Sequence, residues 1–300
     1  MISIDKITEV FCKVDDFCQP FTETLKSRQL TERVAKRNRK SIMSDSEVIT
    51  IAIIFHLGAF RNMKHFYLNY VCKHLQSEFP DTISYNRFVE RMQSTLLPMC
   101  IFLKTCRLGK CTGISFIDST PLRVCHTRRE YIHKTFKGIA KKGQCSIGWF
   151  FGFKLHIIIN DKGEILDFML TPGNVDDRKP LESKNIISKL YGKLFGDKGY
   201  ISKSLFENLF IDGIHLVTKI RKNMKNSLML MADKIALRKR ALIETVNDEL
   251  KNICQIEHTR HRSFENFLTN MISGLIAYSF LDKKPSINLV QNSETGITLS

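Results

Sequence analysis

The spacing of apolar residues predicts that the first 110 residues of the chain are helical. Apolar side chains three and four positions apart lie on one face of a helix. The first segment with this spacing contains Ile4, Ile7, Val10, Phe11, Val14 and Phe17. Pro20 is expected to end this helix, because proline has no backbone N–H to donate. Ser44, with Glu47 three residues later, has the signature of a capping box and predicts the start of a second helix.

Two further helices are expected before residue 110. One covers residues 62–78 and stops near Pro80, and Ser84 is placed to cap the next. The helix after Ser84 has an apolar and a basic side, formed by Phe88, Met92, Arg87 and Arg91. This layout resembles a helix–turn–helix, whose last helix enters the DNA major groove, but any three-helix bundle has a similar pattern. Both interpretations stay open at this point.

From Gly113 onwards, short apolar runs alternate with helical segments. The expected strands are 113–119, 149–160, 164–171, 193–199 and 214–219. The expected helices are 178–190, 202–212, 233–254 and 263–281. Three antiparallel strands followed by alternating helices and strands predict a mixed five-stranded sheet flanked by helices. This is the element order of the ribonuclease H-like fold.

The charge of the chain narrows the class of partner. The formal net charge is +16, and two segments carry most of it: residues 123–142 have a net charge of +6, and residues 219–240 have +7. Such concentration favours a polyanion, above all double-stranded DNA, although an anionic membrane surface or a merely solvated face would also fit a basic run. No apolar run of about 18 residues is present, and the N-terminal segment lacks the pattern of a signal peptide, so we expect a cytoplasmic protein without a membrane-spanning helix.

The nine cysteines do not indicate a disulfide framework or a structural zinc site. Their number is odd, and no two of them form a CxxC pair. Free thiols in a reducing cytosol are the expected state.

Three acidic residues are the candidates for chemistry. Asp118 and Asp197 each follow a short apolar run, so we expect them at the carboxyl ends of the first and fourth strands. If those strands are parallel neighbours, the two carboxylates share one edge of the sheet, where a cation between them would offset their repulsion. Alternatively, each residue only begins a turn.

The third acid, Glu244, lies in the helical segment 233–254. At about 100° per residue, four polar side chains share an arc of about 80°, namely Arg240, Glu244, Asp248 and Lys251. The apolar residues Leu242, Val246, Leu250 and Ile253 are expected on the opposite side. An ordinary solvated face, with an Arg240–Glu244 ion pair, is the alternative.

Several motifs together resemble bacterial insertion-sequence transposases with an Asp–Asp–Glu triad, and most closely the insertion sequence 982 family. These are FIDSTPLRVC, GWFFGFKLHIIIN, LTPGNVDDR, GDKGYIS and RxxxExxxxxxK, the last formed by Arg240, Glu244 and Lys251. The position three residues before Arg240, a tyrosine in many relatives, is Leu237 here. The resemblance covers nearly the whole chain.

The resemblance implies a function and a site. Asp118, Asp197 and Glu244 would hold two Mg²⁺ or Mn²⁺ ions, cleave DNA at a transposon end and join its 3′-OH to target DNA. A homodimer would hold the two terminal inverted repeats together. The expected parts are a helical DNA-binding domain (1–110), a catalytic domain (111–284) and a flexible tail (285–300). The expected DNA contacts are Arg240, Lys251, Arg87, Arg91, Arg128, Arg129, Arg221 and Lys222.

Two other functions remain as alternatives: a metal-dependent nuclease that does not join strands, and a transposase-derived DNA-binding protein that no longer cuts. Other polar or aromatic residues are expected to have structural roles. Tyr200, His156 and Trp149 are interpreted as packing residues, and Asp176 and Asp177 as residues that begin a helix. His126 and His133 lie in the first basic segment, where they could contact DNA.

Overall fold

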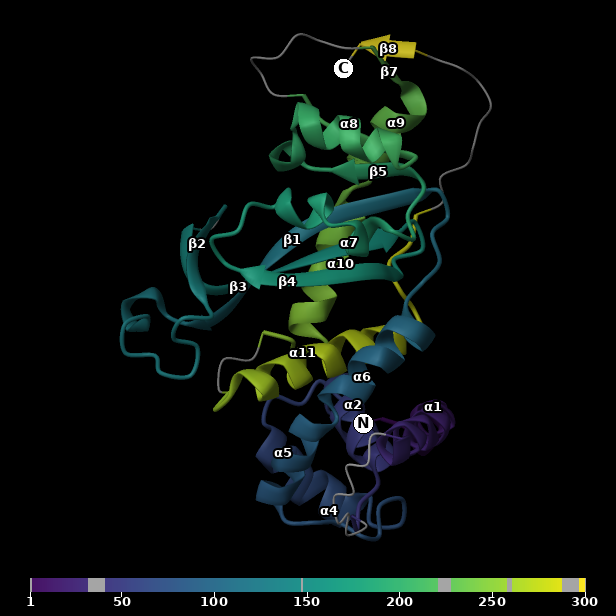
Figure 1. Cartoon of the computed structure of the whole chain (residues 1–300), viewed down its shortest axis with the longest axis vertical. Helices are drawn as coiled ribbons and strands as arrows, with labels where there is room; N and C mark the ends of the chain where they lie inside the picture. The colour runs from purple at the N-terminus through teal and green to yellow at the C-terminus, as the bar shows by residue number, and fades with distance from the viewer. Residues whose placement is uncertain are drawn as a thin grey trace. The chain divides into compact units, whose positions relative to one another are not determined.

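Residues 2–31, 41–146, 148–220, 228–257, 261–287 and 297–299 are described by a computed structural model (Figure 1). The chain forms two units. The helical unit consists of Met1–Arg107 and Leu250–Leu281, and the sheet unit of Leu108–Glu249 and Asp282–Ser300. The packing thus groups the helix near residue 270 with the N-terminal helices, whereas the sequence pattern assigns it to the second domain.

The helical unit is built around two buried helices. Most residues of α2 (Asp45–Leu57) are buried, and so are most of α11 (Phe264–Ser279), as expected for helices that are apolar on every side. His56 of α2 binds the carbonyl of Cys254 through Nδ1, and its Nε2 lies 2.8 Å from Ser273 Oγ of α11. The other helical segments are α1 (Ile4–Thr31), α3 (Met63–His65), the π-helix η1 (Phe66–Val71), α4 (Cys72–His74), α5 (Tyr85–Ser94), α6 (Leu96–Phe102) and the π-helix η2 (Leu103–Arg107).

The N-terminal predictions have mixed outcomes. The capping box is confirmed, since Ser44 Oγ accepts a hydrogen bond from Glu47 N and Ser44 N donates to Glu47 Oε2. The predicted end at Pro20 is wrong, because α1 continues through this residue. Pro20 and Asp16, four residues earlier, are both exposed, so water can bind the carbonyl that proline leaves without a donor.

The sheet unit contains a mixed six-stranded sheet with strand order β2-β3-β1-β5-β6, and β4 also pairs with β3. The strands are β1 (Ile114–Cys125), β2 (Lys141–Cys145), β3 (Gly148–Asn160), β4 (Ile165–Pro172), β5 (Gly192–Gly196) and β6 (Ile214–Thr218). The predicted antiparallel meander is present as β1, β3 and β4, and β1 is parallel to β5. The sixth strand, β2, arises in the basic segment, where the sequence pattern predicts no strand.

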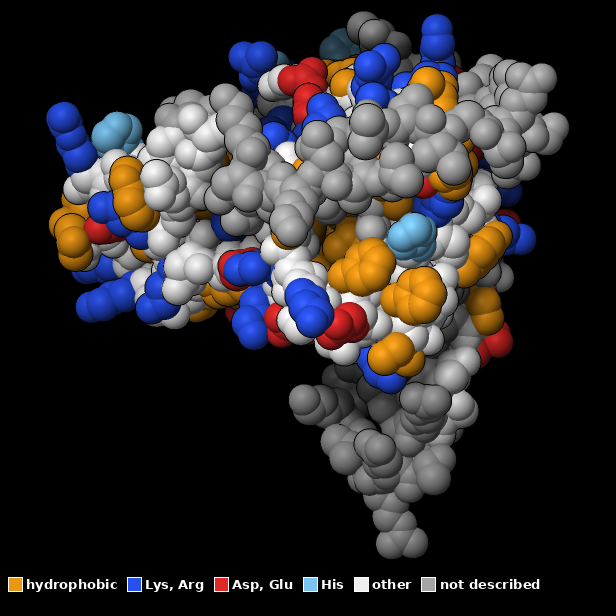
Figure 2. All heavy atoms as spheres, turned by 90° about the horizontal axis from the view of Figure 1, so that it is seen from above, with side chains coloured by type: hydrophobic (Ala, Val, Ile, Leu, Met, Phe, Trp, Pro, Cys, Tyr) orange, Lys and Arg blue, Asp and Glu red, His pale blue; other side chains and the backbone are white. Residues whose placement is uncertain are grey.

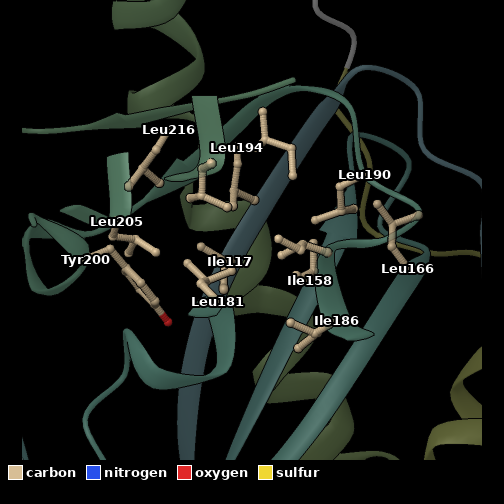
Figure 3. Close-up of a cluster of buried hydrophobic side chains, with 13 residues drawn as sticks. Ile117, Ile158, Leu166, Leu181, Ile186, Leu190, Leu194, Tyr200, Leu205 and Leu216 are labelled. Atoms are coloured by element: carbon tan, nitrogen blue, oxygen red, sulfur yellow. The ribbon is translucent and has the colours of Figure 1, made fainter. Parts of the chain in front are cut away.

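Helices cover both faces of this sheet. The structure has α7 (Lys184–Ile187) and α8 (Lys203–Ile211) on one side, where they bury a cluster that includes Ile117 of β1, Ile158 of β3 and Leu194 of β5 (Figure 3). On the other side, α9 (Met231–Arg238) is joined to β5 by the ion pair Lys193–Asp233, and α10 (Ala241–Asn252) contacts β1. In Figure 1, α10 lies behind β1, β3 and β4.

Two helix predictions in this unit need correction. Instead of a helix over 178–190, a 3₁₀ turn η4 (Lys179–Glu182) precedes the one-turn α7, because Pro180 cannot continue a helix from the residues before it. The segment 233–254 is not one helix: it turns at Lys239 and Arg240, between α9 and α10. The remaining short elements are the 3₁₀ turns η3 (Thr127–Arg129) and η5 (Lys198–Tyr200), and the pair β7 (Leu228–Leu230) and β8 (Ile297–Leu299).

Gly192 allows β5 to begin beside β1. Its φ is +80°, and an added Cβ would lie 2.4 Å from Gly113 O, the carbonyl that accepts the hydrogen bond of Lys193 N. We predict that Gly192→Ala lowers the free energy of unfolding by more than about 2 kcal/mol, because left-handed backbone and displacement of β1 both cost energy. Gly213, with φ +77° and nothing within 4 Å of an added Cβ, is the control, and Gly213→Ala should cost about 1 kcal/mol. Equal losses in urea unfolding would contradict this account.

Candidate active site

The register of two parallel strands places Asp118 and Asp197 at corresponding positions. Phe116 of β1 pairs with Phe195 of β5; Asp118 lies two residues further along β1, and Asp197 lies two residues after Phe195, directly after the end of β5. Side chains two residues apart point to the same side, so both carboxylates lie beyond the stacked rings of Phe116 and Phe195, whose centroids are 5.5 Å apart. The condition that these two strands are parallel neighbours is therefore met.

Asp118 does not end its strand, contrary to the prediction. The strand β1 continues to Cys125 because its pairing with β3 continues, whereas its pairing with β5 stops at Phe116. The ladder to β5 thus stops before Pro121, which has no N–H to donate to it. Asp118 consequently lies where two strands diverge.

Asp197 has a local reason for its position. Its Oδ1 accepts a hydrogen bond of 2.8 Å from Gly199 N, which fixes the turn η5 directly after β5. A Cβ at Gly199 would lie 2.9 Å from that oxygen, so a side chain there would crowd the carboxylate. Asp197 itself is exposed.

Arg240 links Asp118 to the helix that carries Glu244. Its Nη1 lies 3.6 Å from Asp118 Oδ1, and its Nη2 donates a 2.8 Å hydrogen bond to Glu244 Oε1. The ion pair expected as the alternative to a metal site is therefore present. The Glu244 side chain is 59% exposed, whereas that of Asp118 is 22% exposed, so Glu244 has the greater freedom to change rotamer.

Asn247 is a site residue that the sequence analysis missed. It lies one turn after Glu244 on α10, is buried, and donates a 3.0 Å hydrogen bond from Nδ2 to Asp118 Oδ2. Among the described residues, its other polar side-chain atom, Oδ1, has no hydrogen-bond partner and is buried. Asn247 follows Val246 on the half of the helix that faces the sheet. A polar residue among apolar ones at that position is the feature of the sequence that could have indicated its role.

The environment of Asp118 disfavours its negative charge. Burial raises the pKa of its carboxyl to about 6, and the nearby Asp197 and Glu244 add to this effect, while Arg240 opposes it. Asp197 and Glu244 thus both lie within electrostatic range of Asp118. A site with this excess of negative charge is suited to bind cations.

A cavity of about 260 Å³ opens beside Asp197. It is lined by Gly196, Asp197, Lys198, Lys219, Leu237 and Arg240. Carboxylate and cationic groups thus border the same space, which suits a ligand that carries both phosphate oxygens and an associated metal ion.

The donor set fits a hard divalent cation in its chemistry. All three candidate ligands are carboxylates, the oxygen donors that Mg²⁺ and Mn²⁺ prefer over zinc. In the described part of the chain, no three His, Cys, Asp or Glu side chains are grouped tightly enough to hold one ion. Glu244 is held by Arg240, and it would have to leave this ion pair to join the other two carboxylates.

The raised pKa of Asp118 predicts a pH dependence of stability. The ordinary pKa of an aspartate is 3.8, and the folded value is about 6, so ionisation is less favourable in the folded state. The stability cost of this carboxylate is therefore absent below pH 4, grows as the pH rises through 6, and is complete above it. In EDTA, raising the pH from 5 to 8 should increase the unfolding free energy of Asp118→Asn, relative to that of wild type, by roughly 1 kcal/mol. A shift of opposite sign would contradict the assignment.

The predicted DNA contacts lie in different surroundings. Arg87 on α5 is exposed, whereas Arg91 is half-buried and contacts Asp45 at 2.5 Å, at the start of α2. Lys251 lies 3.6 Å from Glu257. Arg128 and Arg129 are exposed on η3. Arg221 and Lys222 lie outside the described residues.

Trp149 is not a core residue, so this prediction is wrong. The side chain is 59% exposed near the start of β3, because Trp149 pairs with Gln144 of β2 at the margin of the sheet. Lys142 Nζ lies 5.4 Å from the centroid of its ring. Tyr131 and Ile132, in the same basic segment, are exposed as well. Aromatic and cationic side chains are thus exposed on one segment.

Three other polar residues singled out from the sequence have partners in the protein. The Asp176 carboxylate accepts hydrogen bonds from the backbone N and the guanidinium of Arg178. Asp177 Oδ1 lies 2.9 Å from Lys154 Nζ. His156 is buried, as predicted, with Nε2 2.9 Å from Thr171 Oγ1, and burial lowers its pKa to about 4. Tyr200 packs in the cluster of Figure 3, which confirms its packing role.

Within the described residues, every helix is too short or too polar to span a bilayer.

Comparison with known proteins gives one family match. Residues 108–264, more than half of the chain, match the model of a transposase DDE domain. A piggyBac transposase synaptic complex with hairpin DNA aligns with 90% of this chain and 70% of its own, at 10% identity and a TM-score of 0.48. The Mos1 strand transfer complex aligns with 86% and 83%, at 11% identity and a TM-score of 0.24. No curated protein matches the chain. With the mixed sheet and its flanking helices, the family match confirms the predicted ribonuclease H-like class.

Proposed function

The chain belongs to the transposase DDE domain family, and on that premise we propose that it cleaves DNA at the ends of a transposable element and joins the freed 3′-OH to target DNA. The single observation that carries this proposal is the placement of Asp118 and Asp197 two residues after the paired Phe116 and Phe195 of β1 and β5, with the Glu244 helix contacting Asp118. We further propose membership of the insertion sequence 982 family, a bacterial cytoplasmic origin and a homodimer on DNA.

The proposed catalytic residues are Asp118, Asp197 and Glu244. They would hold two Mg²⁺ or Mn²⁺ ions, which when bound supply Lewis-acid activation of water and charge stabilisation at the phosphate. Asn247 fixes the orientation of Asp118 through its hydrogen bond. The hydrogen bond from Arg240 holds Glu244 close to the site. Once Glu244 leaves this ion pair to bind a metal ion, the guanidinium of Arg240 can pair with a DNA phosphate.

The DNA would be held by the exposed cations around this site. Lys198 and Lys219 border the cavity, and Arg128 and Arg129 on η3 are further exposed cations of the same unit. Figure 2 shows Lys and Arg side chains distributed over one face, next to a smaller hydrophobic group. Exposed Trp149, with Lys142 above its ring, supports contact with unstacked bases.

The proposal is tested with purified protein, labelled DNA carrying candidate element ends, Mg²⁺ and a target plasmid. The inverted repeats that flank the coding region supply the end sequences. Joined products would support a transposase. Cleavage without joining would favour a metal-dependent nuclease, and binding without cleavage would favour a DNA-binding protein derived from a transposase.

A further inference from the structure

The helix α8 exposes two aromatic rings to solvent. Its buried side chains, Leu205 and Leu209, are four residues apart and belong to the apolar cluster of Figure 3. Phe206 and Phe210 each come one residue later, about 100° further around the helix, and are 40% and 63% exposed. A surface helix ordinarily carries polar side chains at such positions. The packing of α8 on the sheet therefore does not account for these rings.

The two rings form one contiguous group with their neighbours. The centroids of Phe206 and Phe210 are 6.3 Å apart and their planes differ by 13°, so the rings are stacked. The exposed His215 of β6 meets both rings edge-on, at 5.8 and 6.4 Å. Ile211, which follows Phe210, is 80% exposed. These four residues form the α8 patch, and a contiguous exposed patch of this kind marks an interaction surface. Figure 2 shows a group of exposed hydrophobic side chains beside a histidine.

The charge of α8 disfavours DNA as the partner of this patch. The helix contains one cation and one anion, Lys203 and Glu207, and its net charge is zero. The segments 123–142 and 219–240, in contrast, have net charges of +6 and +7. Because DNA is attracted mainly by clustered cations, it favours the basic segments over α8. A neutral apolar patch is suited to a protein surface.

The exposed face of α8 is complementary to itself. At 100° per residue, Lys203, Phe206, Glu207 and Phe210 fall within an arc of about 100°. The side chains of Lys203 and Glu207 are 91% and 58% exposed, and their charged atoms lie 3.9 Å apart. A two-fold axis brings the same surface of two copies together, so Lys203 of each copy can face Glu207 of the other. Both ion pairs then form at once beside the rings.

We propose that the α8 patch is the surface through which two copies of this chain contact each other about a two-fold axis. Its exposed side chains offer roughly 350 Å² per copy, with about 200 Å² for a complete large side chain. Stable complexes bury about 800 Å² per partner, so this contact is weak and reversible on its own. Two copies bound to one DNA complex have a high effective concentration, which favours the contact there. The inference deepens the proposed function, on which the need for two copies rests.

Phe210→Glu tests the interface by sedimentation equilibrium without DNA. Wild type should dimerise with a Kd on the order of 10–100 µM. The variant loses a central aromatic side chain and places a charge in the contact, so its Kd should rise at least about tenfold. Its thermal stability should hardly change, since Phe210 is largely exposed. Leu97→Glu is the matched control: Leu97 is 60% exposed on α6 of the helical unit, and its Kd should stay within about twofold of wild type.

Charge reversal distinguishes a second copy from any other partner. Lys203→Glu leaves two acids on the exposed face of α8, and Glu207→Lys leaves two cations there. Each variant alone repels its own copy, so its self-association should weaken about tenfold at low salt. An equimolar mixture restores both ion pairs and should dimerise with a Kd within about threefold of wild type. This recovery requires a symmetric contact between copies.

The outcomes separate the interface from the proposed function. If wild type is monomeric at about 200 µM, above the expected Kd, the α8 interface is wrong. Dimerisation of Phe210→Glu as strong as that of Leu97→Glu, or a mixture of charge variants that does not recover, would also overturn it. In each of these cases, cleavage of element ends by wild type would still support the proposed function. If wild type dimerises through α8 but does not cleave DNA, the proposed function fails and the interface stands.

Discussion

Replacing Asp118 with asparagine should reduce DNA cleavage by at least about 10³-fold. The substitution keeps the size of the side chain and an oxygen that can accept the hydrogen bond from Asn247. It removes the negative charge that a metal ion needs, and metal ions supply several kcal/mol of transition-state stabilisation in phosphoryl transfer. The single-turnover rate of cleavage in Mg²⁺ measures this loss.

A surface aspartate of the same unit provides the control for Asp118. Asp212 follows α8 and lies 3.9 Å from Lys184, an exposed ion pair that contributes little. Asp212→Asn should cleave within about twofold of wild type. If Asp118→Asn cleaved DNA at a rate close to that of the control, Asp118 would not be a residue of the active site.

Glu244→Gln should reduce cleavage by at least about 10²-fold, with little change in stability. The glutamine can still accept a hydrogen bond from Arg240, and Glu244 is exposed, so the fold loses little. The reaction, however, loses one of three carboxylates, and removal of a single charge-stabilising group in an active site costs about 10²–10³ in rate.

Asp248→Asn is the matched control for Glu244, because Asp248 is an exposed acid one turn further along α10. This variant should retain the wild-type cleavage rate within about twofold. The opposite result, with Asp248→Asn inactive and Glu244→Gln active, would show that the wrong acid of this helix was chosen. Measuring both rates in parallel with DNA affinity separates loss of chemistry from loss of binding.

The sequence predicts those parts of the fold that depend on local patterns. The capping box of Ser44 and the hairpin of β3 and β4 follow from apolar periodicity and turn residues, whereas the parallel pairing of β1 and β5 was only a condition of the predicted site. The buried face of α10 was also predicted for Leu242, Val246 and Leu250. Ile253, expected on that face, is 40% exposed because it follows the end of the helix at Asn252.

Features that depend on tertiary pairing were not predicted. The strand β1 continues past Asp118 because β3 pairs with it, and β2 forms in a segment whose composition is basic rather than apolar. The contact between Asn247 and Asp118 joins residues far apart in the chain, so no local pattern reveals it. The exposure of Phe206 and Phe210 likewise follows from the packing of α8 and not from its apolar spacing.

The central claim is that Asp118, Asp197 and Glu244 form one metal-dependent centre for DNA cleavage. The most direct test replaces the exposed Asp197 with cysteine and compares cleavage in Mg²⁺ and Mn²⁺, with wild type and Asp197→Ala alongside. A thiolate binds Mg²⁺ poorly and softer metals better, so Asp197→Cys should be nearly inactive in Mg²⁺ and recover at least about tenfold in Mn²⁺, while Asp197→Ala stays inactive in both. If Asp197→Cys is as active as wild type in Mg²⁺, or inactive in both metals while wild type cleaves in each, Asp197 is not a metal ligand of the reaction and the proposed centre is wrong.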